Sequence, residues 1–203
     1  MAIYFYEGDL PADVSFGASV AVDSETMGLI PQRDRLCVVQ LSSGDGNAHL
    51  VRFKQSEYNA PNLKRLMTDP DVLKIFHFAR FDVAVMKQYL GIETAPIYCT
   101  KIASKLVRTY TDRHGLKDLC AELANVSLDK QQQSSDWGAD EISKAQQSYA
   151  ASDVLYLHTL KEKLDIMLAR EGRAELAMAA FAFLSTRADM DLAGFGAMDI
   201  FSH

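Results

Sequence analysis

The chain has 203 residues, enough to bury a sizeable core, and a single domain is the expected organisation. Its composition, 48% hydrophobic and 24% charged, is typical of a globular protein, and no apolar run approaches the roughly 18 residues that a membrane-spanning helix needs. The net charge of −6 argues against a protein that coats long nucleic acid by charge alone, although cations held by some of the acids would leave phosphate chemistry open.

The opening residues, "MAIYFYEGDL", have no basic region and soon turn acidic, so they do not resemble a secretory signal. The three cysteines, Cys37, Cys99 and Cys120, are scattered and lack the spacing of metal ligands. Both features predict a cytoplasmic protein in a reducing compartment, with no membrane partner.

In chain order, the first fifty residues predict strands and the rest predicts helices with short strands between them. Runs rich in Val, Ile, Leu and aromatic residues predict strands at 3–6, 19–25, 35–43, 48–53 and 72–76, with a short strand or turn at 96–99. Apolar residues at helical spacing predict helices at 60–69, 81–90, 100–110 and 115–123, a long helical region from Ile142, and a last helix from about Arg173 to Arg187. Residues 129–140 are expected to form a polar loop.

An antiparallel meander followed by α/β alternation predicts an α/β fold, with a mixed sheet flanked by helices and the first strand at its edge. We expect one domain over residues 1–187 and a tail over 188–203. The tail contains Phe195, Met198, Ile200 and Phe201 among glycines and acids, a composition typical of a segment that docks on a neighbouring subunit.

Four carboxylates and one phenol are placed where they could meet. Asp23 and Glu25 are two apart on a predicted strand and should point to the same side, where they would repel each other unless a cation lay between them. Asp82 follows a strand near a helix start, and Tyr149 and Asp153 share one helix face at i, i+4. Oxygen-only ligands suit Mg²⁺ or Mn²⁺, and a pair of such ions can catalyse phosphodiester displacement.

Each of these residues also has an ordinary structural interpretation. Two acids spaced like Asp23 and Glu25 occur on many surface strands, and Asp82 could simply favour the helix dipole. Tyr149 could be a core aromatic residue, and Asp153 could pair with a lysine on an exposed face. The occurrence of all five in order, each on a suitable element, favours a metal site.

The motifs resemble those of the DEDD-type 3′–5′ exonucleases, in the ribonuclease D branch, which have a ribonuclease-H-like fold. "DSETMGL" resembles the first motif of that family, "HFARFD" the second, and "YAASD" the third in its tyrosine form. "HGLKDLCAEL" and "SSDWG" are also similar to ribonuclease D segments, so the resemblance covers roughly residues 15 to 165.

The chain departs from ribonuclease D in two ways. It ends too early to hold helical RNA-binding domains, and "GADEIS" follows "SSDW" where many relatives have an Arg-Pro pair. Both departures resemble the short form called nano-RNase C, which removes very short RNA leftovers.

The resemblance implies that Asp23, Glu25, Asp82 and Asp153 hold two divalent cations, Mg²⁺ or Mn²⁺, and that Tyr149 orients the attacking water. A phenol with a pKa of about 10 is a poor base at neutral pH, so a positioning role is expected. The implied activity is two-metal-ion hydrolysis of very short oligoribonucleotides, down to dinucleotides, to nucleoside 5′-monophosphates. Longer RNA, or single- or double-stranded DNA ends, is the alternative substrate, and an inactive nucleic-acid-binding module is the alternative of another class.

Several further residues are candidates for substrate contacts. The backbone of Thr26, Met27 and Gly28 is expected near the ribose, and Leu29 is expected either to wedge between bases or to pack in the core. His77 and Phe81 are candidates for the sugar or base pocket, and Trp137 for base stacking or for anchoring its loop.

Phosphate contacts are expected from basic residues around two helices. Lys101, Lys105 and Arg108 would share a helix face, either solvated or phosphate-binding. His114 and Lys117 are the better candidates, because a helix start offers free backbone N–H groups to an anion. The short relatives form octameric rings, so a homo-oligomer is implied, and no organic cofactor is expected.

Overall fold

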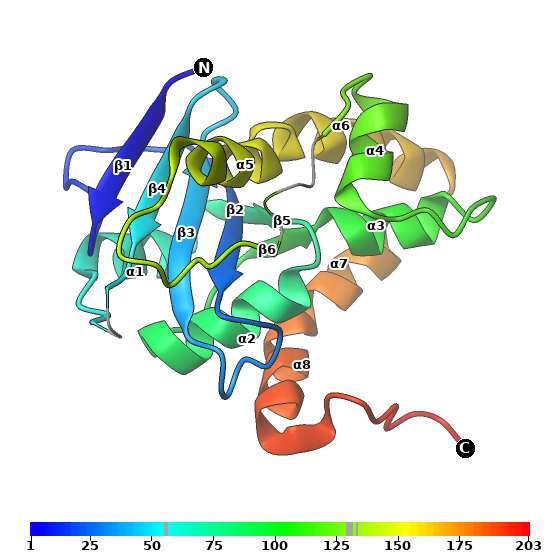
Figure 1. Cartoon of the computed structure of the whole chain (residues 1–203). Helices are drawn as coiled ribbons and strands as arrows, with labels where there is room; N and C mark the ends of the chain where they lie inside the picture. Colours follow the sequence, from blue (N-terminus) through cyan, green and yellow to red (C-terminus); the bar gives the residue numbers. More distant parts are fainter. Residues whose placement is uncertain (55–56, 129–131, 133) are drawn as a thin grey trace.

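In a computed structural model of the chain, which describes residues 1–54, 57–128, 132 and 134–203, one six-stranded sheet carries helices on both faces (Figure 1). The strand order is β1-β4-β3-β2-β5-β6. The strands are β1 (Ile3–Glu7), β2 (Ser19–Thr26), β3 (Leu36–Ser42), β4 (Ala48–Arg52), β5 (Leu73–Phe76) and β6 (Ile97–Cys99). The first five lie where the sequence predicts strands, and β6 lies where a short strand or turn is predicted.

The pairing confirms a mixed sheet. Strands β2, β3 and β4 form the predicted antiparallel meander, while β5 runs parallel to β2 and β6 parallel to β5. Strand β1 lies at the edge as predicted, but it joins parallel to β4, outside the meander.

The helices also follow the predicted order. They are α1 (Pro61–Thr68), α2 (Ala79–Leu90), α3 (Thr100–Val107), α4 (Leu116–Leu123), α5 (Lys144–Leu155), α6 (Leu157–Arg170), α7 (Ala174–Ala182) and α8 (Leu184–Met190). The long predicted helical region is two helices that meet at Tyr156. The last predicted helix is also two helices, α7 and α8, divided at Phe183; α8 continues past Arg187 to Met190 and is followed by a π-helical turn, η1 (Asp191–Phe195). Residues 129–131 and 133 of the predicted polar loop lie outside the described residues.

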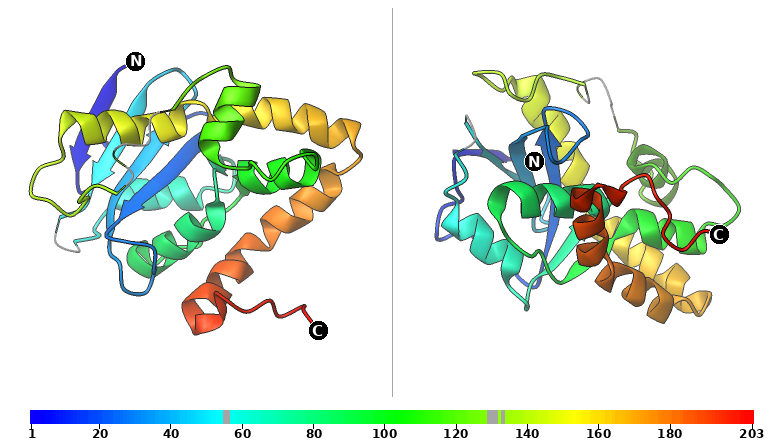
Figure 2. Two further views of the ribbon diagram at one scale, coloured as in Figure 1. Left: turned by 45° about the vertical axis from the view of Figure 1, so that its right-hand side comes forward. Right: turned by 90° about the horizontal axis from the view of Figure 1, so that it is seen from below.

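Helix α5 crosses one face of the sheet, and α1 and α2 lie on the other (Figure 2). Strand β3 is consequently buried along its whole length, which explains its nearly unbroken apolar sequence. A capping box starts α5: the Ser143 hydroxyl accepts from the backbone N–H of Gln146 (3.2 Å), and the Gln146 side chain accepts from the backbone N–H of Ser143 (3.0 Å). No helix in the described part of the chain is long and apolar enough to cross a bilayer.

Strand β5 contains a buried lysine that predicts a pH dependence of stability. The Nζ atom of Lys74 donates to the carbonyl oxygens of Asp69 (2.5 Å) and Ala95 (2.6 Å), and burial lowers the pKa of Lys74 to about 8. Because this pKa lies below the ordinary value of 10.5, the unfolded chain binds more protons between these two pH values. The lysine therefore makes the protein more stable as the pH rises through that interval.

We expect the free energy of unfolding of the wild type, relative to a Lys74→Met variant, to increase by about 2 kcal/mol between about pH 7.5 and 9.5. Urea unfolding of both proteins across that interval measures the difference. A difference that stays constant or shrinks with pH would contradict the assignment.

Candidate active site

The end of strand β2 carries Asp23 and Glu25 beyond the point where its neighbour β5 stops pairing. Strand β2 pairs with β5 only over Ser19–Ala21, whereas its pairing with β3 continues to Thr26. The last residues of β2 are therefore bordered by β3 alone. This leaves space beside the strand for residues from other elements.

Helix α5 brings Asp153 to the two acids of β2, as the sequence predicts. One carboxylate oxygen from each of Asp23, Glu25 and Asp153 lies within 4.8 Å of the other two. These residues come from a strand and from a helix more than 120 residues later in the chain. We call these three side chains the acidic cluster.

Asp82 lies beside the acidic cluster rather than in it. It comes from the first turn of α2, is buried, and its Oδ1 accepts a hydrogen bond from the Ser24 hydroxyl at 2.6 Å. Ser24 lies between Asp23 and Glu25 on β2, so the same strand segment supplies two acids of the cluster and holds the Asp82 carboxylate. The negative charge of Asp82 raises the pKa of both Asp23 and Glu25, in keeping with its closeness.

The electrostatics of these acids favour a bound cation. Burial, and then the charges of the neighbouring carboxylates, raise the pKa of Asp23 and Glu25 well above their ordinary values. Burial also raises the pKa of Asp82, although the hydrogen bond from Ser24 opposes this. Hard divalent cations such as Mg²⁺ and Mn²⁺ prefer carboxylate oxygens, so the donor set fits such an ion.

Gln40 is a site residue that the sequence interpretation missed. Its Nε2 donates to Asp23 Oδ2 (3.2 Å) and Glu25 Oε1 (3.4 Å), and the side chain is fully buried. The β2–β3 register places Gln40 directly opposite Asp23, so the two side chains share a face. The signal in the sequence was one amide within the apolar run "CVVQL".

Tyr149 lies next to the acidic cluster and lines the same cavity. Burial, and then the charges of Asp153, Glu25 and Asp23, raise the pKa of the phenol above its ordinary value.

Trp137 packs beside this phenol. The centroids of the Trp137 and Tyr149 rings are 6.1 Å apart, and Trp137 is only 3% exposed. Trp137 thus packs as an anchor for its loop, one of the two roles considered for it, and also borders the cavity described next.

A cavity of about 690 Å³ opens over the acidic cluster, and we call it the catalytic cavity. It brings together most of the predicted substrate contacts, namely Thr26, Met27, Gly28, Leu29, His77, Phe81, Lys117 and Trp137. His114 is absent from the described residues that line it. Instead, the Nδ1 atom of His114 pairs with the Ser104 hydroxyl at 2.8 Å.

Leu29 is 84% exposed, so core packing, one of its two predicted roles, is wrong. The residue stands on the β2–β3 loop at the rim of the catalytic cavity. An apolar side chain held in solvent there is available to contact a ligand.

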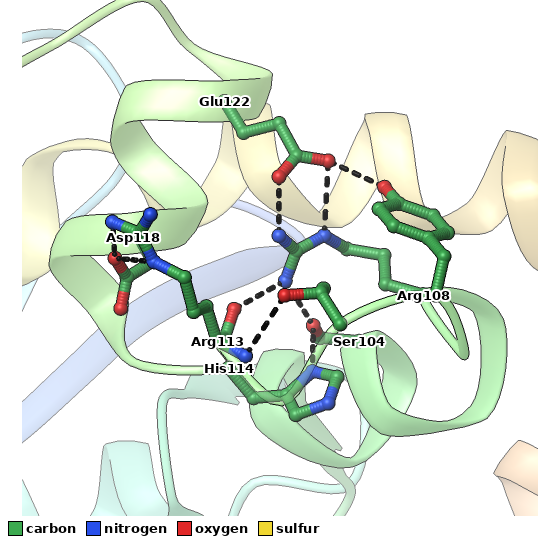
Figure 3. Close-up of polar contacts among 8 residues, drawn as sticks. Ser104, Arg108, Arg113, His114, Asp118 and Glu122 are labelled. Carbon is green, nitrogen blue, oxygen red and sulfur yellow. Dashed lines mark hydrogen bonds and ion pairs between the residues drawn. The ribbon is translucent and has the colours of Figure 1, made fainter.

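Arg108 does not lie on the exposed face that the sequence predicts for it. The spacing predicts a solvated or phosphate-binding face shared with Lys101 and Lys105, but Arg108 is fully buried. Its guanidinium donates to Glu122, to the Ser104 hydroxyl (3.0 Å) and to the carbonyl of Arg113 (2.7 Å), as Figure 3 shows. Helix α4 and the loop before it fold back over the end of α3 and cover this face.

The loop after β2 leaves no room for a side chain at Gly28. A Cβ atom at this position would lie 2.8 Å from Asp34 Cγ, and the Asp34 carboxylate accepts from the backbone N–H of Ile30 at 2.9 Å. We expect Gly28→Ala to destabilise the protein by about 1–3 kcal/mol, because the carboxylate must move. Urea unfolding measures this. Gly196→Ala is the matched control, since its Cβ would lie 3.5 Å from the nearest atom; an equal effect of both changes would contradict the crowding argument.

Comparison with known proteins places these features among nucleases. The sequence model of a family described as 3′–5′ exonuclease matches residues 9–169. Ribonuclease D of Acidiphilium cryptum is 35% identical over 156 residues, which is 77% of this chain and 39% of the relative. Ribonuclease D of Gluconacetobacter diazotrophicus is 34% identical over 166 residues, 82% of this chain and 42% of the relative. The chain thus spans about two fifths of the length of these curated relatives.

Solved structures of one relative are similar over the whole chain, and a more distant one over most of it. Brucella melitensis NrnC is 54% identical with a TM-score of 0.97, and the likeness covers 100% of both chains. The same protein bound to pGG is 53% identical with a TM-score of 0.97, covering 100% of this chain and 99% of that one. Escherichia coli RNase D, at 24% identity and a TM-score of 0.74 over 84% of this chain and 45% of its own, shares the fold and so confirms the predicted ribonuclease-H-like architecture.

Proposed function

The chain belongs to the 3′–5′ exonuclease family, as its motifs predict, and from that premise we propose that it hydrolyses very short oligoribonucleotides, down to dinucleotides, to nucleoside 5′-monophosphates. The observation that carries this proposal is the convergence of three carboxylates within 4.8 Å beneath one cavity of about 690 Å³. The likeness to NrnC bound to pGG supports a short substrate.

Asp23, Glu25, Asp82 and Asp153 hold two divalent cations, Mg²⁺ or Mn²⁺, in this proposal. Support comes from the oxygen-only donor set, from the partial burial of the acidic cluster, and from the likeness to NrnC with bound Mg²⁺. Such ions, when bound, make a water molecule more acidic and offset charge on the phosphate. Gln40 keeps the Asp23 and Glu25 carboxylates side by side, and Ser24 keeps the Asp82 carboxylate turned toward β2.

Tyr149 positions the attacking water in this proposal, and it does not act as a tyrosinate. Its Oη keeps the proton at neutral pH in this proposal, because the ordinary pKa of a phenol is about 10 and burial raises it. A lone pair of the hydroxyl remains able to accept a hydrogen bond. Packing beside Trp137 limits the movement of the ring.

The substrate lies in the catalytic cavity with its 3′-terminal nucleotide over the acidic cluster. Leu29 wedges against the bases, His77 and Phe81 border the sugar or base, and Lys117 faces a phosphate. The backbone of Thr26, Met27 and Gly28 approaches the ribose; the Thr26 hydroxyl, bonded to the Gly28 carbonyl, holds that turn. His114 does not belong to this set, because its ring is held by Ser104 outside the cavity lining.

We also infer a cytoplasmic homo-oligomer, an octameric ring, built from an exonuclease domain (1–187) whose C-terminal segment (188–203) docks on a neighbour. Phe195, Met198, Ile200 and Phe201 are between 44% and 80% exposed, which supports burial against another copy. Light scattering is expected to give the mass of eight chains at micromolar concentration. A monomer would contradict this assembly.

A length series tests the proposed substrate. RNAs of two to ten nucleotides, a ten-nucleotide DNA and a DNA duplex are labelled at the 5′ end and incubated with Mg²⁺ or Mn²⁺. We expect kcat/KM to be at least about tenfold higher for the two-mer than for the ten-mer. Similar rates on all lengths would favour the alternative, an exonuclease of longer RNA or DNA ends.

A further inference from the structure

A second cavity, of about 430 Å³, adjoins the catalytic cavity, and Leu29 and Phe81 line both. Three segments distant in the sequence form its walls. These are the β2–β3 loop with Gln32, the start of α2 with Phe78 and Arg80, and the C-terminal turn η1 with Asp191. Leu29, exposed between the two cavities, is placed to divide them.

Side-chain hydrogen bonds from Arg80 and Gln32 join the C-terminal turn to the other two walls. Arg80 donates from Nε and from a terminal nitrogen to the two carboxylate oxygens of Asp191, both at 2.6 Å, and from the same terminal nitrogen to the Gly196 carbonyl at 2.6 Å. The Gln32 amide donates to the Asp191 carbonyl, also at 2.6 Å. A bidentate pair with a carboxylate that is only 11% exposed is a strong, well-oriented interaction. The turn is therefore a wall of the second cavity rather than a loose end.

Phe78 offers an aromatic surface in this cavity. Its backbone is left-handed (φ 72°, ψ 41°), a conformation that is unfavourable for a bulky side chain and is often found at functional sites. The ring is nevertheless 44% exposed. The Nζ atom of Lys101, which also lines the catalytic cavity, lies 4.3 Å from the ring centroid. An exposed ring with a cation beside it suits a nucleobase joined to a phosphate.

We propose that the second cavity receives the nucleotide on the 5′ side of the scissile bond, with its base against Phe78, and that η1 closes the groove behind it. The two cavities then hold one nucleotide each, with Leu29 between the bases. The Arg80–Asp191 pair would thereby limit the length of the substrate. This inference rests on the proposed function and adds the device that selects short RNA.

Breaking the Arg80–Asp191 ion pair tests whether η1 limits the length of the substrate. For Asp191→Ala we expect the ratio of kcat/KM for a ten-mer to that for a two-mer to rise at least about tenfold. Arg80→Gln should show the same rise, because it breaks the same ion pair from the α2 side and leaves the C-terminal segment in place. Asp189→Ala is the matched control, since Asp189 also joins α8 to α2, through Lys87, but lines neither cavity.

An unchanged ratio in both Asp191→Ala and Arg80→Gln would overturn the assignment of η1 as the wall that limits substrate length. A similar rise in Asp189→Ala would also overturn it, because loosening of α8 would then explain the effect. The wild-type rates on the two-mer and the ten-mer distinguish a failure of the wall from a failure of the proposed function. Equal rates on two-mer and ten-mer by the wild type would count against the function itself, whereas a wild-type preference for the two-mer that survives in the variants would count against the wall alone.

The aromatic surface has its own test. Phe78→Asn removes the ring while placing at this position a residue that tolerates left-handed backbone. We expect KM for the two-mer to rise about tenfold with kcat nearly unchanged, and Phe78→Tyr to restore the wild-type KM. An unaltered KM in Phe78→Asn would exclude stacking on this residue.

Discussion

Replacing Asp153 by asparagine is expected to lower kcat on an RNA dinucleotide at least about a thousandfold, even with Mn²⁺ in excess. The change removes one of the three carboxylates that lie within 4.8 Å of one another, and an amide is a much weaker ligand for a hard cation. The loss should appear in binding as well. Calorimetric titration with Mn²⁺ is expected to show that the high-affinity binding of the wild type is gone.

The same variant should be more stable than the wild type when no metal is present. Burial and mutual repulsion raise the pKa of Asp23 and Glu25, so the metal-free fold is destabilised by its own acidic cluster. Thermal unfolding in EDTA is expected to give a higher Tm for Asp153→Asn, and Mn²⁺ should raise the Tm of the wild type only.

Asp165→Asn is the matched control for Asp153→Asn. It makes the same chemical change on α6, at a partly exposed residue paired with Lys161, outside the catalytic cavity. Its activity and Mn²⁺ binding should match the wild type. Full activity in Asp153→Asn would leave the metal-site assignment untenable.

Replacing Tyr149 by phenylalanine is expected to lower kcat about a hundredfold while leaving the Kd for Mn²⁺ unchanged. The variant keeps the ring beside Trp137 and loses only the hydroxyl that orients the water. Because Tyr149 is protonated at neutral pH in our proposal, the logarithms of kcat for both proteins should run parallel between about pH 6 and 9. A tyrosinate base would instead give the wild type an extra rise with pH that the variant lacks.

Tyr156→Phe provides the control for the loss of a hydroxyl. Tyr156 lies at the junction of α5 and α6, close in sequence to Tyr149 but outside the lining of the catalytic cavity. The Tyr156→Phe variant should retain the wild-type kcat. If Tyr149→Phe weakened Mn²⁺ binding to the same extent as it lowered kcat, the positioning role would be replaced by a structural one.

Local sequence patterns were enough to predict the elements and the main acids of the candidate site. The pairs Asp23/Glu25 and Tyr149/Asp153 each share one side of an element, because side chains alternate along a strand and repeat every three to four residues on a helix. Five of the six strands were predicted because runs of β-branched and aromatic residues between turn residues mark buried strands, whereas the three-residue β6 was left open as a strand or a turn.

Relations between distant segments could not be predicted from these patterns. Gln40 became a site residue because the β2–β3 register sets it opposite Asp23, and Arg108 became a buried clamp because α4 folds over it. Leu29 could not be assigned to core or surface until its loop was placed.

The sequence by itself determined which residues could carry metal-dependent chemistry and on which elements they lie. Only the tertiary structure decided how far apart they are, which of them line the cavity, and what borders that cavity. The clearest case is the Arg80–Asp191 pair, whose partners are 111 residues apart in the chain. Local periodicity reports the side of an element on which a residue lies, whereas the partner facing that side depends on how the whole chain packs.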